Sequence, residues 1–129
     1  MQTPVIRTIH HEHCHWSWSN ALEPVLSIQP GETVEIRTTE SSGGQIGPDS
    51  TAADAADLDF SRINPVTGPL FVEGAEPGDV LRLHILETVA SGWGWTAIIP
   101  EFGLIAEQFL VPALRLWSYN PNTQVPAAL

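Results

Sequence analysis

Residues 76–89 read EPGDVLRLHILETV and combine a turn signal with the most apolar run of strand-forming residues. The first four residues signal a turn, because proline suits the corner of a β-turn and glycine supplies a positive φ. The next ten residues, 80–89, are rich in Val, Leu and Ile, a pattern typical of a strand buried on both faces for part of its length. We therefore predict a turn followed by the strongest strand of the chain.

The same arrangement occurs earlier in the chain, at residues 29–34, which read QPGETV. In the strand predicted at 33–39, Val34 and Ile36 alternate with polar residues, so one face should be buried. Repeated turn-and-strand units at short spacing are typical of a sandwich or barrel. Further strands are predicted at 4–9 with a continuation to 15, and at 24–29, 69–73, 93–99 and 110–117.

One short helix is predicted around residues 50–60, because Asp49, Ser50 and Thr51 can accept hydrogen bonds from the first N–H groups of a helix. The sequence of 129 residues contains eleven Pro and ten Gly, all of them outside residues 50–60, where they separate short apolar runs. The predicted fold class is therefore mostly β, a β-sandwich or barrel-like domain with one short helix. The length suits a single domain, assigned to 1–119 and followed by a Pro-rich tail, 120–129.

The charge balance excludes several partners. Fifteen Asp and Glu oppose five cationic residues, all of them Arg, which gives a formal net charge of −10. Nucleic acid binding needs a cluster of Lys and Arg, and an anionic membrane surface repels an acidic protein. No apolar run is long enough for a membrane-spanning helix, and the first 15 residues lack the apolar core of a signal peptide. A cytoplasmic location is expected, with Cys14 as a lone thiol.

Four of the five histidines lie in residues 10–15, which read HHEHCH. In an extended strand alternate side chains share a face, so His11, His13 and His15 would line one face. Three imidazoles are suitable ligands for zinc, copper or nickel, with a further ligand from elsewhere. The alternative is a polar, solvated edge strand.

Two short segments offer groups for amide or acid–base chemistry. Gly43, Gly44 and Gln45 present backbone N–H groups and an amide that could hold an oxyanion or a substrate carbonyl; the alternative is an ordinary turn. Asp54 and Asp57 share one face of the predicted helix and could act as a base or a metal ligand. The alternative is helix capping and a solvated face.

Five Trp in 129 residues is a high number. Trp93 and Trp95 are separated by Gly94, and Trp16 and Trp18 by Ser17, so in extended chain each pair shares a face. Large rings can line a pocket; core packing or a subunit interface is the alternative.

Taken together, long strings of this sequence resemble the acetamidase/formamidase family. The strings are GGQ at 43–45, ST at 50–51, INPVTGP at 63–69, VEGAEPGDVL at 72–81, GWGWTAIIP at 92–100 and FGL at 102–104. The resemblance covers nearly the whole chain, from about residue 16 to 116, and is to the N-terminal half of the family. The family carries a Gly-Asp-x-His…Gly-Asp-Gly-Glu motif in its later half, associated with the metal and catalytic centre, and this chain ends before it.

The resemblance implies a mostly β, oligomeric hydrolase that converts short linear amides, formamide or acetamide, into a carboxylate and ammonia. It implies a divalent metal, zinc ahead of calcium. Gln45 and Asp54 would be the catalytic residues. The amide would be bound by Gly43, Gly44, Trp93 and Trp95.

Because the later half is missing, the chain would be such an amidase or its N-terminal part, completed by a second polypeptide or working as a homo-oligomer. An apolar surface at Leu110, Val111, Leu114 and Trp117 would serve the association. The alternative function is a non-catalytic β-module that binds a transition metal through His11, His13 and His15, or an oligomeric interaction protein.

Overall fold

The computed structural model describes residues 6–123 and 126–128, the last three by their backbone alone. The chain forms two compact units. The first unit combines Met1–Gly44 with Phe60–Leu81, and the second combines Gln45–Asp59 with Arg82–Leu129. Each unit is therefore built from two separate segments of the chain.

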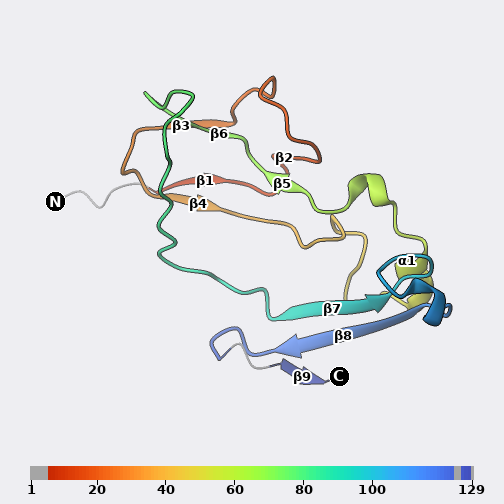
Figure 1. The fold of residues 1–129 in the computed structure, drawn as a ribbon. Helices are drawn as coiled ribbons and strands as arrows, with labels where there is room; N and C mark the ends of the chain where they lie inside the picture. Colours follow the sequence, from red (N-terminus) through yellow and green to blue (C-terminus); the bar gives the residue numbers. More distant parts are fainter. Residues whose placement is uncertain (1–5, 124–125, 129) are drawn as a thin grey trace. The chain divides into compact units, whose positions relative to one another are not determined.

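The first unit contains three pairs of short strands (Figure 1). Two of the pairs are parallel: β1 (Arg7–Ile9) with β4 (Val34–Ile36), and β3 (Leu26–Ile28) with β6 (Leu70–Val72). The third is antiparallel and joins β2 (Cys14–His15) to β5 (Val66–Thr67). A single 3₁₀ turn, η1 (Phe60–Arg62), precedes β5. Because the partners are far apart in sequence, long connections join them, as parallel pairing requires.

Both predicted Pro-Gly turns are confirmed, and they share one mechanism. In the first, the Glu32 N–H donates to the Gln29 carbonyl at 3.1 Å, and the Glu32 carboxylate accepts the Gln29 N–H at 2.7 Å. In the second, Asp79 makes the corresponding bonds with Glu76 at 3.0 and 2.9 Å. Glycine adopts positive φ in each turn, +86° and +106°. The acidic residue therefore closes the turn from both its backbone and its side chain.

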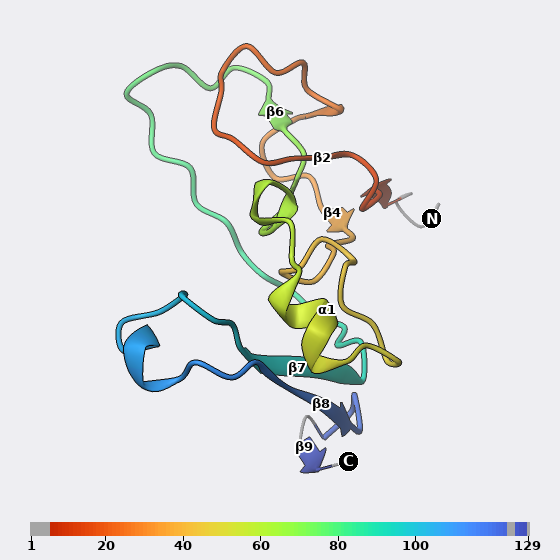
Figure 2. The ribbon, with the colours of Figure 1, turned by 90° about the vertical axis from the view of Figure 1, so that its right-hand side faces the viewer.

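The second unit is a helix packed on an antiparallel sheet, as Figure 2 shows. Strand β7 (Trp93–Ile98) pairs with β8 (Ala113–Tyr119), which pairs on its other side with β9 (Pro126–Ala128). Between β7 and β8 lies a 3₁₀ turn, η2 (Ala106–Gln108). The helix, α1, spans Ala52–Ala56. The buried core comes from its segment and the sheet face beneath it: Ile46, Ala55 and Leu58, with Trp95, Ala97, Ile99, Leu114 and Leu116 packed against them.

The mostly β class with one short helix around residues 50–60 is confirmed. The strands predicted at 24–29, 33–39, 69–73, 93–99 and 110–117 are present, with shorter or shifted bounds. Residues 4 and 5 of the first predicted strand lie outside the described residues. The single domain over 1–119 and the tail over 120–129 stay predictions; β9 falls within that tail.

The strand predicted at 80–89 is wrong. The segment has no regular structure, and no described strand lies in register with it. Val80, Leu83, Ile85 and Val89 are exposed. A strand needs a partner for its backbone groups, and the described part of the chain offers none.

The continuation of the first strand to residue 15 is also wrong. The chain turns after β1, where the His13 N–H donates to the His10 carbonyl at 3.0 Å, and resumes as β2. Among the described residues, no helix is long and apolar enough to cross a lipid bilayer.

Candidate functional site

The Gly43–Gly44 loop surrounds a carboxylate of its own chain. The Gly44 N–H donates to Glu40 Oε1 at 2.7 Å, and the Ser42 N–H donates to Glu40 Oε2 at 2.8 Å. The Gly43 N–H donates to the Glu40 carbonyl at 3.0 Å. The N–H groups of Ser42 and Gly44 thus converge on one carboxylate, and this Ser42–Gly44 nest has a geometry that can hold an oxyanion. In this conformation the nest holds Glu40.

Glycine is required at one position of this loop. Gly43 has φ +71°, and a Cβ added there would collide with the Arg62 carbonyl oxygen. Gly44 has φ +83° but open space where its Cβ would be. The loop thus combines two left-handed residues with one close backbone approach.

Gln45 belongs to the second unit, and both polar atoms of its side-chain amide form hydrogen bonds with the backbone of Asp59. Its Oε1 accepts the Asp59 N–H at 2.8 Å, and its Nε2 donates to the Asp59 carbonyl at 3.1 Å. The side chain is half-buried. The contact ties together the two ends of the segment that carries α1.

Asp54 lies in the first turn of α1 and caps it. Its Oδ2 accepts the Thr51 backbone N–H at 2.6 Å and the Thr51 hydroxyl at 2.9 Å. These bonds, the backbone one first, hold the pKa of this exposed carboxyl below its ordinary value of 3.8. A carboxylate that stays ionised at neutral pH can accept a proton only weakly, which favours a capping role over that of a general base in this conformation.

The two tryptophans predicted to bind substrate lie on β7. Trp95 packs against the core formed by Ile46, Ala55 and Leu58, so its ring supports α1. Trp93 is half-buried on the same strand. The core-packing alternative therefore holds for Trp95.

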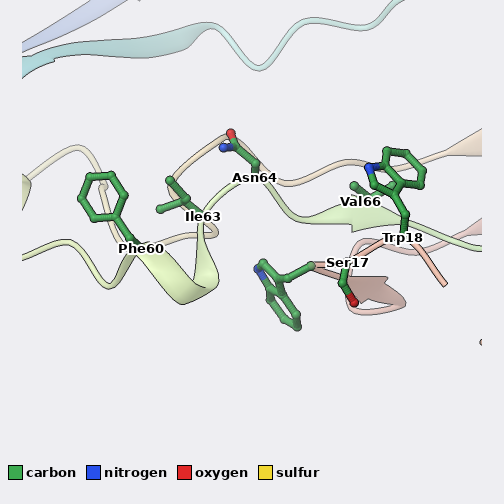
Figure 3. A pocket seen from close by; sticks show the side chains of 7 residues that line it. Ser17, Trp18, Phe60, Ile63, Asn64 and Val66 are labelled. Atoms are coloured by element: carbon green, nitrogen blue, oxygen red, sulfur yellow. The ribbon is translucent and has the colours of Figure 1, made fainter. Parts of the chain in front are cut away.

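A hollow of about 380 Å³ lies in the first unit. Its lining comes from two segments: Trp16, Ser17, Trp18, Phe60, Ile63, Asn64 and Val66. Figure 3 shows Phe60 and Ile63 toward one end and Trp18 toward the other, with Asn64 between them. The Trp16 indole N–H donates to the Arg62 carbonyl at 2.8 Å, which fixes one wall.

Trp16 and Trp18 were predicted as a pair that can line a pocket, but they were not among the predicted site residues. Phe60, Ile63 and Asn64 were missed altogether. They lie in or near the INPVTGP string, 63–69, which supported the family resemblance but no site prediction. The string's high content of turn residues was the only signal available for them.

The three histidines do not line one face, because the turn at 10–13 breaks the strand. His15 Nδ1 lies 3.0 Å from the Ser17 carbonyl oxygen, and its ring meets Trp18 edge-on at 6.2 Å between centroids. His11 Nδ1 lies 3.5 Å from Glu12 Oε2. Within residues 6–123, no three His, Cys, Asp or Glu side chains lie together as a metal site would need. A metal bound through His11, His13 and His15 stays a prediction and would need ligands from outside the described residues.

The structure thus divides the predicted site residues between its units. Gly43, Gly44 and the three histidines belong to the first unit, together with the hollow. Gln45, Asp54, Trp93 and Trp95 belong to the second.

Comparison with known proteins defines the class. The fold is similar to the crystal structure of an acetamidase from Bacillus halodurans, with a TM-score of 0.72 and 26% identity over 95% of this chain and 42% of that one. A formamidase from Methylophilus methylotrophus is 29% identical over 112 residues, which are 82% of this chain and 28% of the relative. An acetamidase from Mycolicibacterium smegmatis is 28% identical over 119 residues, 82% of this chain and 29% of the relative.

All three are named acetamidase or formamidase, and the sequence model of the acetamidase/formamidase family matches residues 4–127 of this chain. The chain belongs to the acetamidase/formamidase family. It spans less than a third of the length of the curated relatives that it matches.

Proposed function

We propose that this chain supplies part of a hydrolase that cleaves the carbon–nitrogen bond of short linear amides such as formamide and acetamide. The observation that carries the proposal is the family match over residues 4–127, together with similarity to proteins named formamidase and acetamidase. In the reaction, the oxygen of water adds to the amide carbonyl carbon and the carbon–nitrogen bond breaks. The nitrogen leaves with both protons of the water, giving a carboxylate and ammonium.

The oxyanion formed in this reaction needs N–H donors. The Ser42–Gly44 nest, which includes Gly43, has donors for that role, since the N–H groups of Ser42 and Gly44 already bind the carboxylate of Glu40. The role requires Glu40 to leave the nest when substrate enters. Gln45 would act beside it as a further donor.

Asp54 and Gln45 are proposed as catalytic residues of the complete assembly only. Each is engaged in the chain described here, Asp54 with Thr51 and Gln45 with Asp59. Catalysis would require each to exchange this partner for substrate or water. Trp93 and Trp95 would border the amide and leave room for short acyl groups alone.

The assembly is proposed to contain either a second polypeptide that supplies the rest of the family fold or further copies of this chain. A zinc or calcium ion, if held in that assembly, would draw ligands from polypeptide outside the described residues, so no step is assigned to it. The cytoplasm is the proposed location, in keeping with the lone thiol of Cys14.

The test is ammonia release from formamide and acetamide, measured on the purified chain alone and after addition of a polypeptide that carries the rest of the family fold. Solution mass and metal content are measured on the same samples. We expect release only from the combined sample, reduced by Asp54→Asn and unchanged by the neighbouring Asp57→Asn. Absence of release from both samples would contradict the proposal, and tight zinc or copper without release would favour the metal-binding module.

A further inference from the structure

One segment of the second unit is extended and rich in apolar residues, and it has no strand partner in the part of the chain that the structure describes. Arg82–Val89 runs toward β7 with no helix, turn or strand along it (Figure 1). No backbone–backbone hydrogen bond links this segment to any described residue. The side chains of Leu83, Ile85 and Val89 are 82%, 78% and 84% exposed.

Such exposure costs free energy that a packing partner would recover. Burying a Leu, Ile or Val side chain removes apolar surface from water and therefore favours association. In an extended chain, Leu83, Ile85 and Val89 fall on the same face, with Glu87 between them. The segment therefore combines unpaired backbone groups with one largely apolar face. These are the features of an edge strand to which a further strand can be added.

The size of the relatives indicates where that neighbour comes from. The acetamidase structure from Bacillus halodurans overlaps 95% of this chain, yet the overlap accounts for only 42% of that protein. More than half of that fold therefore lies outside the part that this chain supplies. A second copy of the chain is a poorer partner, because it would bring together two bodies of net charge −10.

We propose that Arg82–Val89 is the docking strand for the polypeptide that supplies the rest of the family fold. It pairs through its backbone with an extended strand of that polypeptide, whose apolar side chains cover Leu83, Ile85 and Val89. This inference rests on the proposed function, since it names the surface through which the two parts of the hydrolase assemble.

The probe is the part of the Methylophilus methylotrophus formamidase outside the 112 matched residues, produced as a separate polypeptide. Backbone amide hydrogen exchange is measured on this chain alone and with the probe, alongside solution mass. We expect amides 82–89 to exchange freely in the monomeric chain and to slow at least about tenfold in the complex. Slow exchange in the chain alone would overturn the proposal, whether its mass is that of a monomer or a dimer. Failure of the probe to bind, or binding without protection of 82–89, would overturn it too.

A matched pair of variants tests the face. Leu83→Asp places a charge on the proposed contact and should weaken probe binding at least about tenfold. Leu104→Asp places one on a leucine of the same unit that is even more exposed, 102% against 82%, and should leave binding unchanged. Equal loss in both variants contradicts a contact through this segment. Ammonia release is recorded on the same complex, so protection of 82–89 without release refutes the proposed function alone.

Discussion

The side-chain amide of Gln45 pairs with the backbone N–H and carbonyl of Asp59, much as two backbones pair in a β-ladder. The Gln45 amide accepts the Asp59 N–H at 2.8 Å and donates to the Asp59 carbonyl at 3.1 Å. The residues between them carry α1 and the core residues Ile46, Ala55 and Leu58. The contact therefore closes the loop whose inner side chains cover the β7–β8 sheet.

The first prediction concerns this closure. Gln45→Glu keeps an acceptor for the Asp59 N–H but replaces the donor with an oxygen that faces the Asp59 carbonyl. We expect the free energy of unfolding to fall by about 1–3 kcal/mol, the cost of an unsatisfied polar contact. Urea unfolding measures it, and Gln108→Glu, at an exposed position of the same unit, is the control. Equal stability of the two variants would show that the closure contributes nothing.

The second prediction separates backbone strain from collision in the glycine loop. Gly44→Ala should cost about 1 kcal/mol, since only the positive φ opposes it. Gly43→Ala should cost clearly more, because its Cβ also meets the Arg62 carbonyl oxygen. Thermal unfolding of both variants checks the order, and a larger loss for Gly44→Ala would refute this account of the loop.

The third prediction tests the core beneath α1. Ile46 is 2% exposed, so Ile46→Ala should lower the free energy of unfolding by about 2–5 kcal/mol. Leu104→Ala removes an equally apolar but fully exposed side chain and should change it by no more than about 0.5 kcal/mol. Chemical denaturation distinguishes the two, and similar values would place the core elsewhere.

The fourth prediction concerns pH. The Thr51 hydrogen bonds lower the folded-state pKa of Asp54 below 3.8. A depressed pKa contributes stability that is present above the unfolded-state value and is lost as the pH falls through the folded-state value. The NMR shift of the Thr51 amide proton should therefore titrate with a midpoint below pH 3.8.

Asp54→Asn is the control for this titration, because it removes the ionisable group and keeps an acceptor oxygen. The acid-induced movement of the Thr51 signal should disappear in this variant. Movement centred above pH 3.8 in the unaltered protein would mean that the cap does not stabilise the ionised carboxylate.

Local signals in the sequence predicted local structure well. The two Pro-Gly turns and the Thr51 start of α1 form as predicted, because their hydrogen bonds lie within four residues. Strand β7 was predictable as well, because Trp93 and Trp95 alternate with small residues. In the structure it pairs in register with β8.

Features that depend on distant contacts were not predictable. The segment 80–89 has the composition of a strand, but composition does not reveal whether a partner strand is present. The shared face expected for His11, His13 and His15 does not form for a related reason: alternation holds only in extended chain, and the turn between His10 and His13 was not foreseen. Glu40 was not considered at all, because nothing in its neighbours indicates that its carboxylate would fill the Ser42–Gly44 nest.

The composition of each unit from two chain segments has a consequence during synthesis. The first unit has all of its residues once Leu81 has been made, whereas Ile46 and Leu58 must wait for β7 and β8. At about 5–20 residues per second, a ribosome leaves these apolar side chains without their sheet for several seconds. The segment between Gln45 and Asp59 therefore exposes its apolar side chains on the nascent chain until β8 has been made.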